Sequence, residues 1–445
     1  MVRKAGSWTG PWTGVFFGAT AAFCAGERGQ VTADAHDRAV LGGLAGRVRR
    51  LADRPREREK RDLWYGHNAL RERYPVILCD PENGWNEIVT EDQLECTGSL
   101  ARRWEWVLRR QVFWGEMLLD DRPIEPVFEI GATHMDTGWG IDIEYRGGER
   151  GTSYAWEPAI REPADIGKIR TPVITVDHET TQETAGLARS ILGSDLEVVR
   201  RGPSVHSTHM TRDLATMVGL ENMMVLTHDD PALLHAIMRR FLAGHIERLD
   251  FLEANSLLTL NNDWSYVGSG GIGYCRELPR RRIGAGEAVR TEDLWLHDES
   301  QESIGLSPEM FAQFIYPYQA PLHARFGMNC YGCCEPLEGR WHIVRHIPRL
   351  RRLSVSAWAD ERKMAECLGD RFIYSRKPSP ADLASPQIRE DSARQSIRLT
   401  LEVTRGGCIV ELVMKDNHTI GGNPQNVVRW VRIAREEVER LHGRP

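Results

Sequence analysis

Three cysteines lie within five residues of the chain, at Cys330, Cys333 and Cys334. Neighbouring cysteines rarely reach the geometry of a disulfide bond, so a disulfide framework is not expected at these positions. Thiols this close together can instead supply soft ligands to a metal ion, or a reactive thiolate. The alternative is that they are small buried hydrophobic side chains, as most free cysteines are. The stretch from His323 to Leu337 is therefore the first candidate for chemistry.

Length, charge and cysteine usage bound the class of protein. A chain of 445 residues is long for one core, and it suits either one large barrel with extensions or two domains. The net charge of −6 is spread along the sequence without a basic stripe, which argues against nucleic acid as a partner. Most of the nine cysteines lie in apolar surroundings without regular spacing, which is typical of a reducing compartment. We therefore expect a cytoplasmic protein.

The first residues of the chain superficially resemble a secretory signal peptide. Arg3 and Lys4 are followed by an apolar stretch from Val15 to Ala25. This stretch is shorter than the ~20 residues that cross a bilayer, and it contains Gly18 without a cleavage site at its end. We predict that residues 1–30 are a disordered extension or an overlong start of the reading frame, and we expect no membrane partner.

Residues 31–120 are predicted to form an N-terminal helical extension that packs on the rest of the chain. Apolar residues repeat near a 3.6-residue period over residues 39–51, with Thr32 or Asp34 as the helix cap. Two further elements are predicted within this segment: a short strand over Tyr74–Asp80 and one long amphipathic helix over Leu94–Met117.

From residue 121 onward, apolar strands alternate with amphipathic helices. Strands are predicted over Pro126–His134, Leu196–Gly202, Leu257–Trp264, Trp295–Glu302, the residues before Cys330, Leu353–Trp358, Arg371–Lys377 and Cys408–Asp416. Helices are predicted over Asp177–Leu192, Leu214–Leu226, from Pro231 onward, Pro308–Phe326 and Pro424–Leu441. Such alternation implies parallel pairing, and eight units of this kind close naturally into a (β/α)8 TIM barrel, which we assign to residues 121–445. Residues 137–165 are predicted to be an irregular insertion over one mouth of the fold.

In a barrel of this kind the functional site lies at the carboxyl ends of the strands. The side chains that the predicted strand ends supply are of metal-binding and acid–base types. They are His134, Asn262, Asp263, Gln301, Glu302, Cys330, Cys333, Glu335, Arg376, Lys377, Asp416 and His418. The alternative for each charged residue is an ordinary salt bridge at the barrel mouth.

Three motifs resemble the uroporphyrinogen decarboxylase superfamily, which also contains the corrinoid-dependent methyltransferases. The stretch Leu306–Pro317 is similar to the family's Ser-Pro-x-x-Phe-x-x-Phe-x-x-Pro helix. Tyr331–Leu337 stands where the family has His-x-Cys-Gly, and His418–Asn426 is similar to its closing Gly-Ile-x-Pro-x-Thr-Pro-x-Asn. The segment Thr32–Asp80 resembles a poorly characterised branch that keeps an N-terminal extension. The resemblance implies a (β/α)8 barrel.

The sequence departs from the decarboxylases near the first strand. Their Arg-Gln-Ala-Gly-Arg-Tyr stretch holds the acidic groups of the substrate, whereas this chain reads Val-Ile-Leu-Cys-Asp-Pro after Pro75. A porphyrinogen polyanion therefore lacks its expected cationic partners. Decarboxylation of a small or porphyrinogen-like carboxylic acid is kept as the alternative function.

The resemblance to the methyltransferases implies a zinc ion that binds a thiol substrate and lowers its pKa. Asn329 and Tyr331 stand where the family's His and Cys ligands would be. A displaced ligand set of Cys330, Cys333 and His418 is predicted in their place.

The predicted reaction is transfer of a methyl group between a corrinoid of the methylcobalamin type, carried by a separate corrinoid protein, and a small acceptor such as a thiol or a tetrahydropterin. Glu302, Glu335 and Asp416 are the candidates for proton transfer. The candidates for binding the substrate are His134, Asn262, Asp263, Gln301, Arg376 and Lys377. A corrinoid- or metal-binding protein without turnover is the non-enzymatic alternative, and a homodimer is left open.

Overall fold

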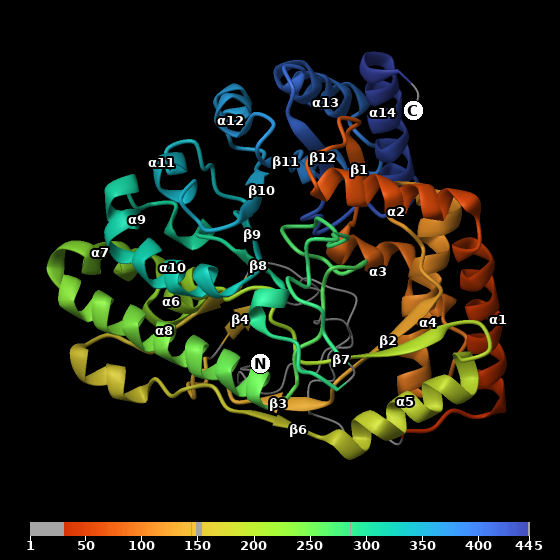
Figure 1. The fold of residues 1–445 in the computed structure, drawn as a ribbon, viewed down its shortest axis with the longest axis horizontal. Helices are drawn as coiled ribbons and strands as arrows, with labels where there is room; N and C mark the ends of the chain where they lie inside the picture. Colours follow the sequence, from red (N-terminus) through yellow and green to blue (C-terminus); the bar gives the residue numbers. More distant parts are fainter. Residues whose placement is uncertain (1–30, 144, 148–153, 285, 444–445) are drawn as a thin grey trace.

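The computed structural model describes residues 31–143, 145–147, 154–284 and 286–443. The predicted extension over residues 1–30 lies outside this part of the chain. Helices and strands alternate along most of the described chain, and Figure 1 shows strands β8 to β12 in the interior with helices α9 to α14 around them. No described helix is both long enough and apolar enough to cross a membrane.

The main sheet has six strands, and every neighbouring pair in it is parallel. Its strands follow the order β1 (Val76–Cys79), β12 (Ile409–Met414), β11 (Ile373–Arg376), β10 (Leu350–Val355), β9 (Met328–Tyr331) and β8 (Trp295–Asp298). These strands are buried along almost their whole length, as expected for a parallel sheet covered by helices. The predicted strands in these six places are confirmed.

The edge strand β1 comes from the N-terminal part of the chain. It pairs with the last strand, β12, with Val76 opposite Glu411 and Cys79 opposite Met414. Residues 31–120 therefore contribute a strand to the sheet as well as four helices. These helices are α1 (Ala35–Ala52), α2 (Pro55–Asn68), α3 (Trp85–Ile88) and α4 (Ser99–Phe113).

The remaining strands form three two-stranded sheets. The pair β2 (Val127–Gly131) and β7 (Glu197–Arg201) is parallel. Two pairs are antiparallel: β3 (His134–Asp136) with β6 (Ile174–Val176), and β4 (Tyr145–Gly147) with β5 (Tyr154–Trp156). An isolated parallel bridge between Ser207 and His297 joins the segment after β7 to β8. The mixed α/β class with parallel strands is thus confirmed, and closure into a (β/α)8 barrel stays a prediction.

One predicted strand, Leu257–Trp264, is wrong: no regular strand forms there. The side chain of Asn261 takes the place of a backbone ladder beside β8. Its Oδ1 accepts from the backbone N–H of Trp295 at 2.9 Å, and its Nδ2 donates to the carbonyl of the same residue at 3.0 Å. A side-chain amide can replace a strand neighbour because it carries the same donor and acceptor as a peptide group.

Three predicted helices are shorter or divided. The helix predicted over Leu94–Met117 is α4, which ends at Phe113 and continues as a π-helical turn over Trp114–Leu118. The helix predicted over Leu214–Leu226 splits into α6 (Met210–Val218) and α7 (Leu220–Asp229) at Gly219, whose φ of +84° favours glycine. The helix predicted over Pro308–Phe326 splits into α9 (Pro308–Phe314) and α10 (Tyr316–Arg325), because Pro317 has no N–H to continue the first helix.

The helices predicted over Asp177–Leu192, from Pro231 onward and over Pro424–Leu441 are confirmed. Asp177 caps α5 (His178–Leu192) by accepting from the N–H of Thr180 at 2.9 Å. Asp230 caps α8 (Pro231–Ala254) in the same way. The remaining helices are α11 (Trp341–Val344), α12 (Glu361–Leu368), α13 (Glu390–Thr404) and α14 (Gln425–His442). Figure 1 shows α13 and α14 next to strands β12 and β1.

Candidate active site

All six strands of the main sheet end at the same edge, because they run parallel. The residues immediately after the strands are mostly polar, and most of them are buried: Asp80, Lys415, Lys377, Ser356, Gly332 and Glu299. Polar side chains that are buried together at the carboxyl ends of parallel strands are the usual setting of an active site. We call the side chains of Glu82, Cys333, Cys334, Lys377, Lys415 and Asp416 the strand-end cluster.

A buried ion pair within the sheet lies beneath this cluster. Arg352 Nε donates to Glu411 Oε1 at 2.9 Å and its Nη2 donates to Oε2 at 3.1 Å. His67 of α2 lies 3.1 Å from the same carboxylate, and the side chains of all three residues are at most 2% exposed. Burial by itself would raise the pKa of Glu411, but the Arg352 guanidinium and the His67 hydrogen bond hold that pKa well below its usual range. The Glu411 carboxylate therefore ties β12 to Arg352 of β10, across the intervening strand β11.

Cys333 carries the most reactive thiol of the site. Its Sγ lies 3.7 Å from Sγ of Cys334 and 3.3 Å from the hydroxyl of Ser269. The hydrogen bond from Cys334 lowers the pKa of Cys333; burial opposes this shift, and the Lys415 ammonium supports it. The same interaction raises the pKa of Cys334. Cys333 is thus the more acidic thiol of the pair, and the thiolate that it forms on losing its proton is the nucleophilic and basic form of cysteine.

Lys415 joins the last strand to the loop after the first. Its Nζ lies 2.6 Å from Oδ1 of Asp416 and 3.2 Å from Oε1 of Glu82. Burial raises the pKa of Glu82 to about 7, against the effect of Lys415. Glu82 and Asp416 both have positive φ, +50° and +60°. Non-glycine residues in this strained region are concentrated at functional sites.

Lys377, after β11, is a second buried cation of the cluster. Its Nζ donates to the carbonyl of Ser375 at 3.2 Å and to the Ser375 hydroxyl. Burial lowers the pKa of Lys377 to about 8, and the Glu411 carboxylate opposes this shift. The lysine therefore changes charge within reach of neutral pH.

Three histidines and one acid lie on the side of the site formed by β8. The rings of His206 and His297 are 5.3 Å apart, and Nδ1 of His209 lies 3.3 Å from Glu299 Oε1. Burial lowers the pKa of His206 to about 4, and it lowers the pKa values of His209 and His297 well below their usual range. Burial, helped by Glu302 and Cys333, raises the pKa of Glu299 well above its usual range. Glu299 is therefore a buried neutral acid beside neutral imidazoles.

The three predicted catalytic carboxylates lie in different settings. Asp416 belongs to the strand-end cluster, where its Oδ2 also lies 3.6 Å from Sγ of Cys334. Glu335 accepts from the backbone N–H groups of Ser300 at 2.8 Å and Cys333 at 2.9 Å, so it fixes the loops after β8 and β9. Glu302 accepts from the hydroxyl of Thr211 at 2.7 Å.

The predicted substrate-binding residues are only partly brought together. Lys377 is in the strand-end cluster, and Asp263 is paired with Arg201 at 2.6 Å beside the pocket described below. The others contact their own surroundings: Arg376 is paired with Glu361 at 2.9 Å, Asn262 donates to the carbonyl of Leu278 at 2.7 Å, Gln301 donates to Glu302 at 3.2 Å, and His134 Nδ1 lies 2.8 Å from the carbonyl of Ala132.

The predicted zinc ligands have separate contacts. The thiol of Cys330 donates to the carbonyl of Val267 and lies 3.6 Å from Nη1 of Arg352. His418 is exposed, and its backbone carbonyl accepts from Asn83 at 2.6 Å. Among the residues that the structure describes, no three His, Cys, Asp or Glu side chains are grouped so that they could hold a metal ion. The positions of Cys330, Cys333 and His418 therefore do not fit a shared zinc ion. The displaced zinc site remains a prediction from the sequence.

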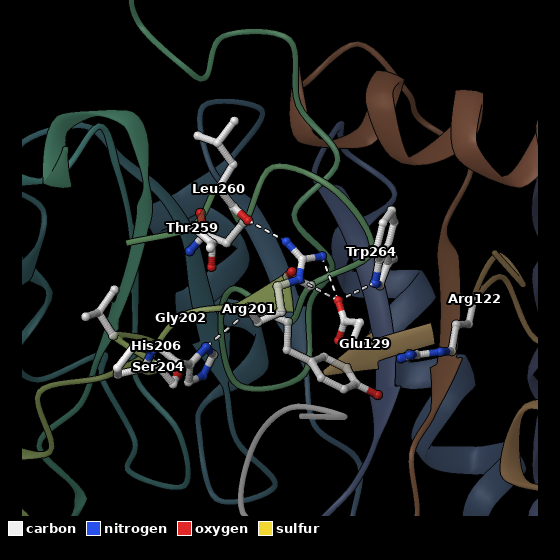
Figure 2. Close-up of a pocket in the computed structure, with 14 residues that line it drawn as sticks. Arg122, Glu129, Arg201, Gly202, Ser204, His206, Thr259, Leu260 and Trp264 are labelled. Carbon is white, nitrogen blue, oxygen red and sulfur yellow. Dashed lines mark hydrogen bonds and ion pairs between the residues drawn. The ribbon is translucent and has the colours of Figure 1, made fainter. Parts of the chain in front are cut away.

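A pocket opens beside the strand ends (Figure 2). It is lined by Arg122, Glu129, Arg201, Gly202, Pro203, Ser204, Val205, His206, Thr259, Leu260, Asn261, Trp264, Ser265 and Tyr266. Two contacts join the pocket to the site: His206 stacks near His297, and the Tyr266 hydroxyl donates to Asp80 at the end of β1. The pocket and the strand-end cluster are thus neighbouring parts of one region.

Several residues of this region were not predicted from the sequence. They are Glu82, His206, His209, His297, Glu299 and Lys415. Lys415 and Glu299 each follow directly after a strand, and this position was the available signal. Glu82 could not be found in the same way, because its segment was assigned to an extension outside the barrel.

Known proteins show little similarity to this chain. No protein-family model matches it, and no curated protein matches it. Among solved structures, a methyltransferase from Methanosarcina mazei is similar at 13% sequence identity and a TM-score of 0.47, over 85% of this chain and 97% of that one.

Proposed function

We propose that this protein is a methyltransferase whose site is the strand-end cluster. The observation that carries the proposal is the state of Cys333. The residue is only 4% exposed, and the Cys334 thiol and the Lys415 ammonium lower the pKa of its thiol. The cluster opens toward solvent at Asp416, whose side chain is 32% exposed. A stabilised base at an opening of this kind suits an acceptor that loses a proton as it is methylated.

The proposed step removes one proton and forms one bond. The sulfur or nitrogen of the acceptor attacks the methyl carbon of the donor, and the bond from that carbon to its former partner breaks with the electron pair left on the partner. The proton of the acceptor S–H or N–H moves to Sγ of Cys333. A base whose pKa lies near the working pH is the most effective one for such a transfer. The positive charge of Lys415 offsets the negative charges of the cluster, because its Nζ is paired with both Glu82 and Asp416.

The methyl donor in this proposal is a corrinoid of the methylcobalamin type, presented by a separate corrinoid protein as a co-substrate. The acceptor is a small thiol or a tetrahydropterin. Zinc would supply a lowered pKa to an acceptor thiol. Because Cys330, Cys333 and His418 are not brought together, the proposed step assigns the proton to Cys333 and passes through no metal.

The test uses methylcobalamin with 2-mercaptoethanol or tetrahydrofolate under anaerobic conditions. We expect the protein to accelerate both the loss of the methyl–cobalt absorbance and the appearance of methylated acceptor, measured by mass spectrometry. Cys333→Ser is expected to lower the rate about 100-fold, the size of a general-base effect. Cys408→Ala, a buried thiol beside Ala365, is the matched control and is expected to keep the rate. Equal rates with and without protein would refute the proposal.

A second candidate function is decarboxylation of a small or porphyrinogen-like acid, and Glu299 is the observation that favours it. A buried neutral carboxyl is a proton donor. In this reaction the bond between the substrate carbon and the carboxylate carbon breaks, and carbon dioxide leaves. The electron pair of that bond stays on the substrate carbon, which then takes the proton of Glu299. Glu299→Gln is expected to abolish decarboxylation of a uroporphyrinogen probe and to leave methyl transfer within a few-fold. Loss of methyl transfer alone in Glu299→Gln would count against this second candidate.

A further inference from the structure

Arg122 is a buried cation at the wall of the pocket with incomplete pairing. The residue is 4% exposed, and its Nε and Nη1 atoms have no hydrogen-bond partner. Its guanidinium stacks on the ring of Trp114, 4.3 Å from the centroid, and lies 5.1 Å from the centroid of Tyr266. Arginine stays protonated in proteins, so this is a full positive charge. Figure 2 shows Arg122 at one side of the pocket, with dashed lines at Arg201 and none at Arg122.

The other charged side chains that line the pocket are paired with each other. Arg201 lies 2.6 Å from Glu129 and 2.6 Å from Asp263, and it also donates to the carbonyl of Leu260 at 2.8 Å. Glu129 accepts in addition from Nε1 of Trp264 at 2.8 Å. Arg201 is therefore neutralised within the protein. Arg122 differs, because burial opposes its charge while Asp80 and Asp120 act on it from a distance and raise its pKa, and its Nε and Nη1 have no hydrogen-bond partner among the described residues.

Asp80, one of the two acids that act on Arg122, already has other partners. It accepts from the Tyr266 hydroxyl and, at 2.6 Å, from Nε1 of Trp85. Its closest cation is Arg110, at 3.9 Å. Arg110 in turn stacks on Trp85 and Trp106, at 4.8 and 4.5 Å from their centroids. Asp80 is therefore occupied by other donors, and the Nε and Nη1 donors of Arg122 are left without a partner among the described residues. Buried donors without an acceptor are costly to a folded protein, so these two N–H groups suit an acceptor supplied by a ligand.

We propose that the pocket binds the carboxylate of a small molecule, with Arg122 as its anchor. The planar fork of an arginine matches a carboxylate, and stacking on Trp114 holds the fork in place. Pro203, Val205, Leu260 and Trp264 supply apolar parts of the pocket lining. These side chains suit an apolar or aromatic body behind the charged group. The bound molecule would extend toward His206 and the strand-end cluster.

The site is tested by binding, so the result does not depend on the proposed methyl transfer. Benzoate is the probe, and benzamide is its neutral counterpart of the same shape. We expect benzoate to raise the melting temperature of the full chain in a dose-dependent way, as a ligand that binds only the folded state must. Benzamide should leave the melting temperature unchanged. Absence of a shift with millimolar benzoate would overturn the proposal, as would equal shifts with the two probes.

Substitutions of Arg122 test whether benzoate binds at this residue. In Arg122→Met the benzoate shift should disappear, because the N–H donors that anchor the carboxylate are removed. Arg58→Met, on the exposed face of α2, is the matched control and should keep the benzoate shift. Arg122→Lys keeps the charge without the fork, and its benzoate Kd should be about tenfold weaker. A benzoate shift that persists in both Arg122 variants would place the ligand elsewhere and refute the assignment.

Inorganic phosphate is the second anion to be compared. A carboxylate site should respond to benzoate at lower concentrations than to phosphate. If phosphate gives the larger shift and Arg122→Met removes it, the pocket binds phosphate groups, and the assignment to carboxylates is wrong.

Discussion

The Sγ atoms of Cys333 and Cys334 lie 3.7 Å apart just after strand β9, and the hydrogen bond between them lowers the pKa of Cys333 and raises that of Cys334. Asp416 lies 3.6 Å from the Sγ of Cys334. A hydrogen bond favours the charged form of the group that accepts it and the neutral form of the group that donates it. Adjacent residues of one type thus acquire different chemistry from the hydrogen bond between them.

The first prediction concerns the reactivity of this pair. Alkylation of Cys333 by iodoacetamide should begin at lower pH than that of an ordinary thiol, because its pKa is lowered by Cys334 and Lys415. Cys334→Ala should move this profile to higher pH, with about a tenfold lower rate at neutral pH for each unit of pKa change. The measurement is peptide mass spectrometry of samples alkylated across a pH series. An unchanged profile in Cys334→Ala would show that the pair is not coupled.

The second prediction concerns Lys377 and alkaline stability. Its pKa in the folded protein is about 8 because of burial, whereas in the unfolded chain it is about 10.4. At pH 7 both states are protonated, so folding bears the full cost of burying the charge, about 3 kcal/mol. This cost is relieved as pH rises from about 8 to about 10.4, since there only the unfolded chain keeps the proton.

Lys377→Met should therefore be more stable than the wild type at pH 7, and this advantage should shrink above pH 8. Urea unfolding at pH 7, 8, 9 and 10 measures it. A difference in the free energy of unfolding that does not change with pH would contradict the assigned shift.

The third prediction concerns the ion pair beneath the site. Glu411→Gln leaves Arg352 charged and buried without its partner, so the free energy of unfolding should fall by about 3–5 kcal/mol at pH 7. The pKa of Glu411 is lowered in the folded state, so this contribution is present above about pH 4.3 and is lost as pH falls below that value. Glu436→Gln is the control: Glu436 is exposed and paired with Arg394 at 2.7 Å, and the cost should be at most about 1 kcal/mol. Equal losses in the two variants would rule out a structural role for the buried pair.

The fourth prediction concerns the cysteines that the sequence places in a zinc site. Cys330 contacts the carbonyl of Val267 and Arg352 in the core, so Cys330→Ala should lower stability and leave methyl transfer within a few-fold. Cys333→Ala should instead lower the rate of methyl transfer and leave stability nearly unchanged. Metal content of the purified protein, measured before and after chelation, is the second readout. Stoichiometric zinc that is lost in both Cys330→Ala and Cys333→Ala would support the zinc set and refute separate roles for the two cysteines.

Much of the sheet could be predicted because its strands are short apolar runs followed by polar residues. This pattern identified Cys333, Lys377 and Asp416, which do meet at one edge. Arg376 shows where the pattern fails. It precedes Lys377 directly, but neighbouring side chains on a strand point to opposite faces, so its guanidinium pairs with Glu361 behind the sheet.

Contacts between distant segments could not be read from the sequence. Lys415 meets Glu82, and Arg122 lies near Tyr266. The first contact follows from the pairing of β1 with β12, and the second joins two segments outside the main sheet. Asn261 is a further case, because a periodic apolar segment predicted a strand there and a single side-chain amide replaced the ladder. Local pattern predicts elements, whereas tertiary pairing decides which polar groups face each other.

The pairing of β1 with β12 has a consequence for folding during synthesis on the ribosome. Ile77 and its partner Leu412 are separated by most of the polypeptide. Strand β1 emerges early, and its apolar residues have no sheet neighbour until the last strand has been synthesised. Contacts of such long sequence separation slow folding, and exposed strand edges favour aggregation in the interval. The nascent chain is therefore expected to need chaperone protection until β12 has been synthesised, and Lys415 reaches Glu82 only then.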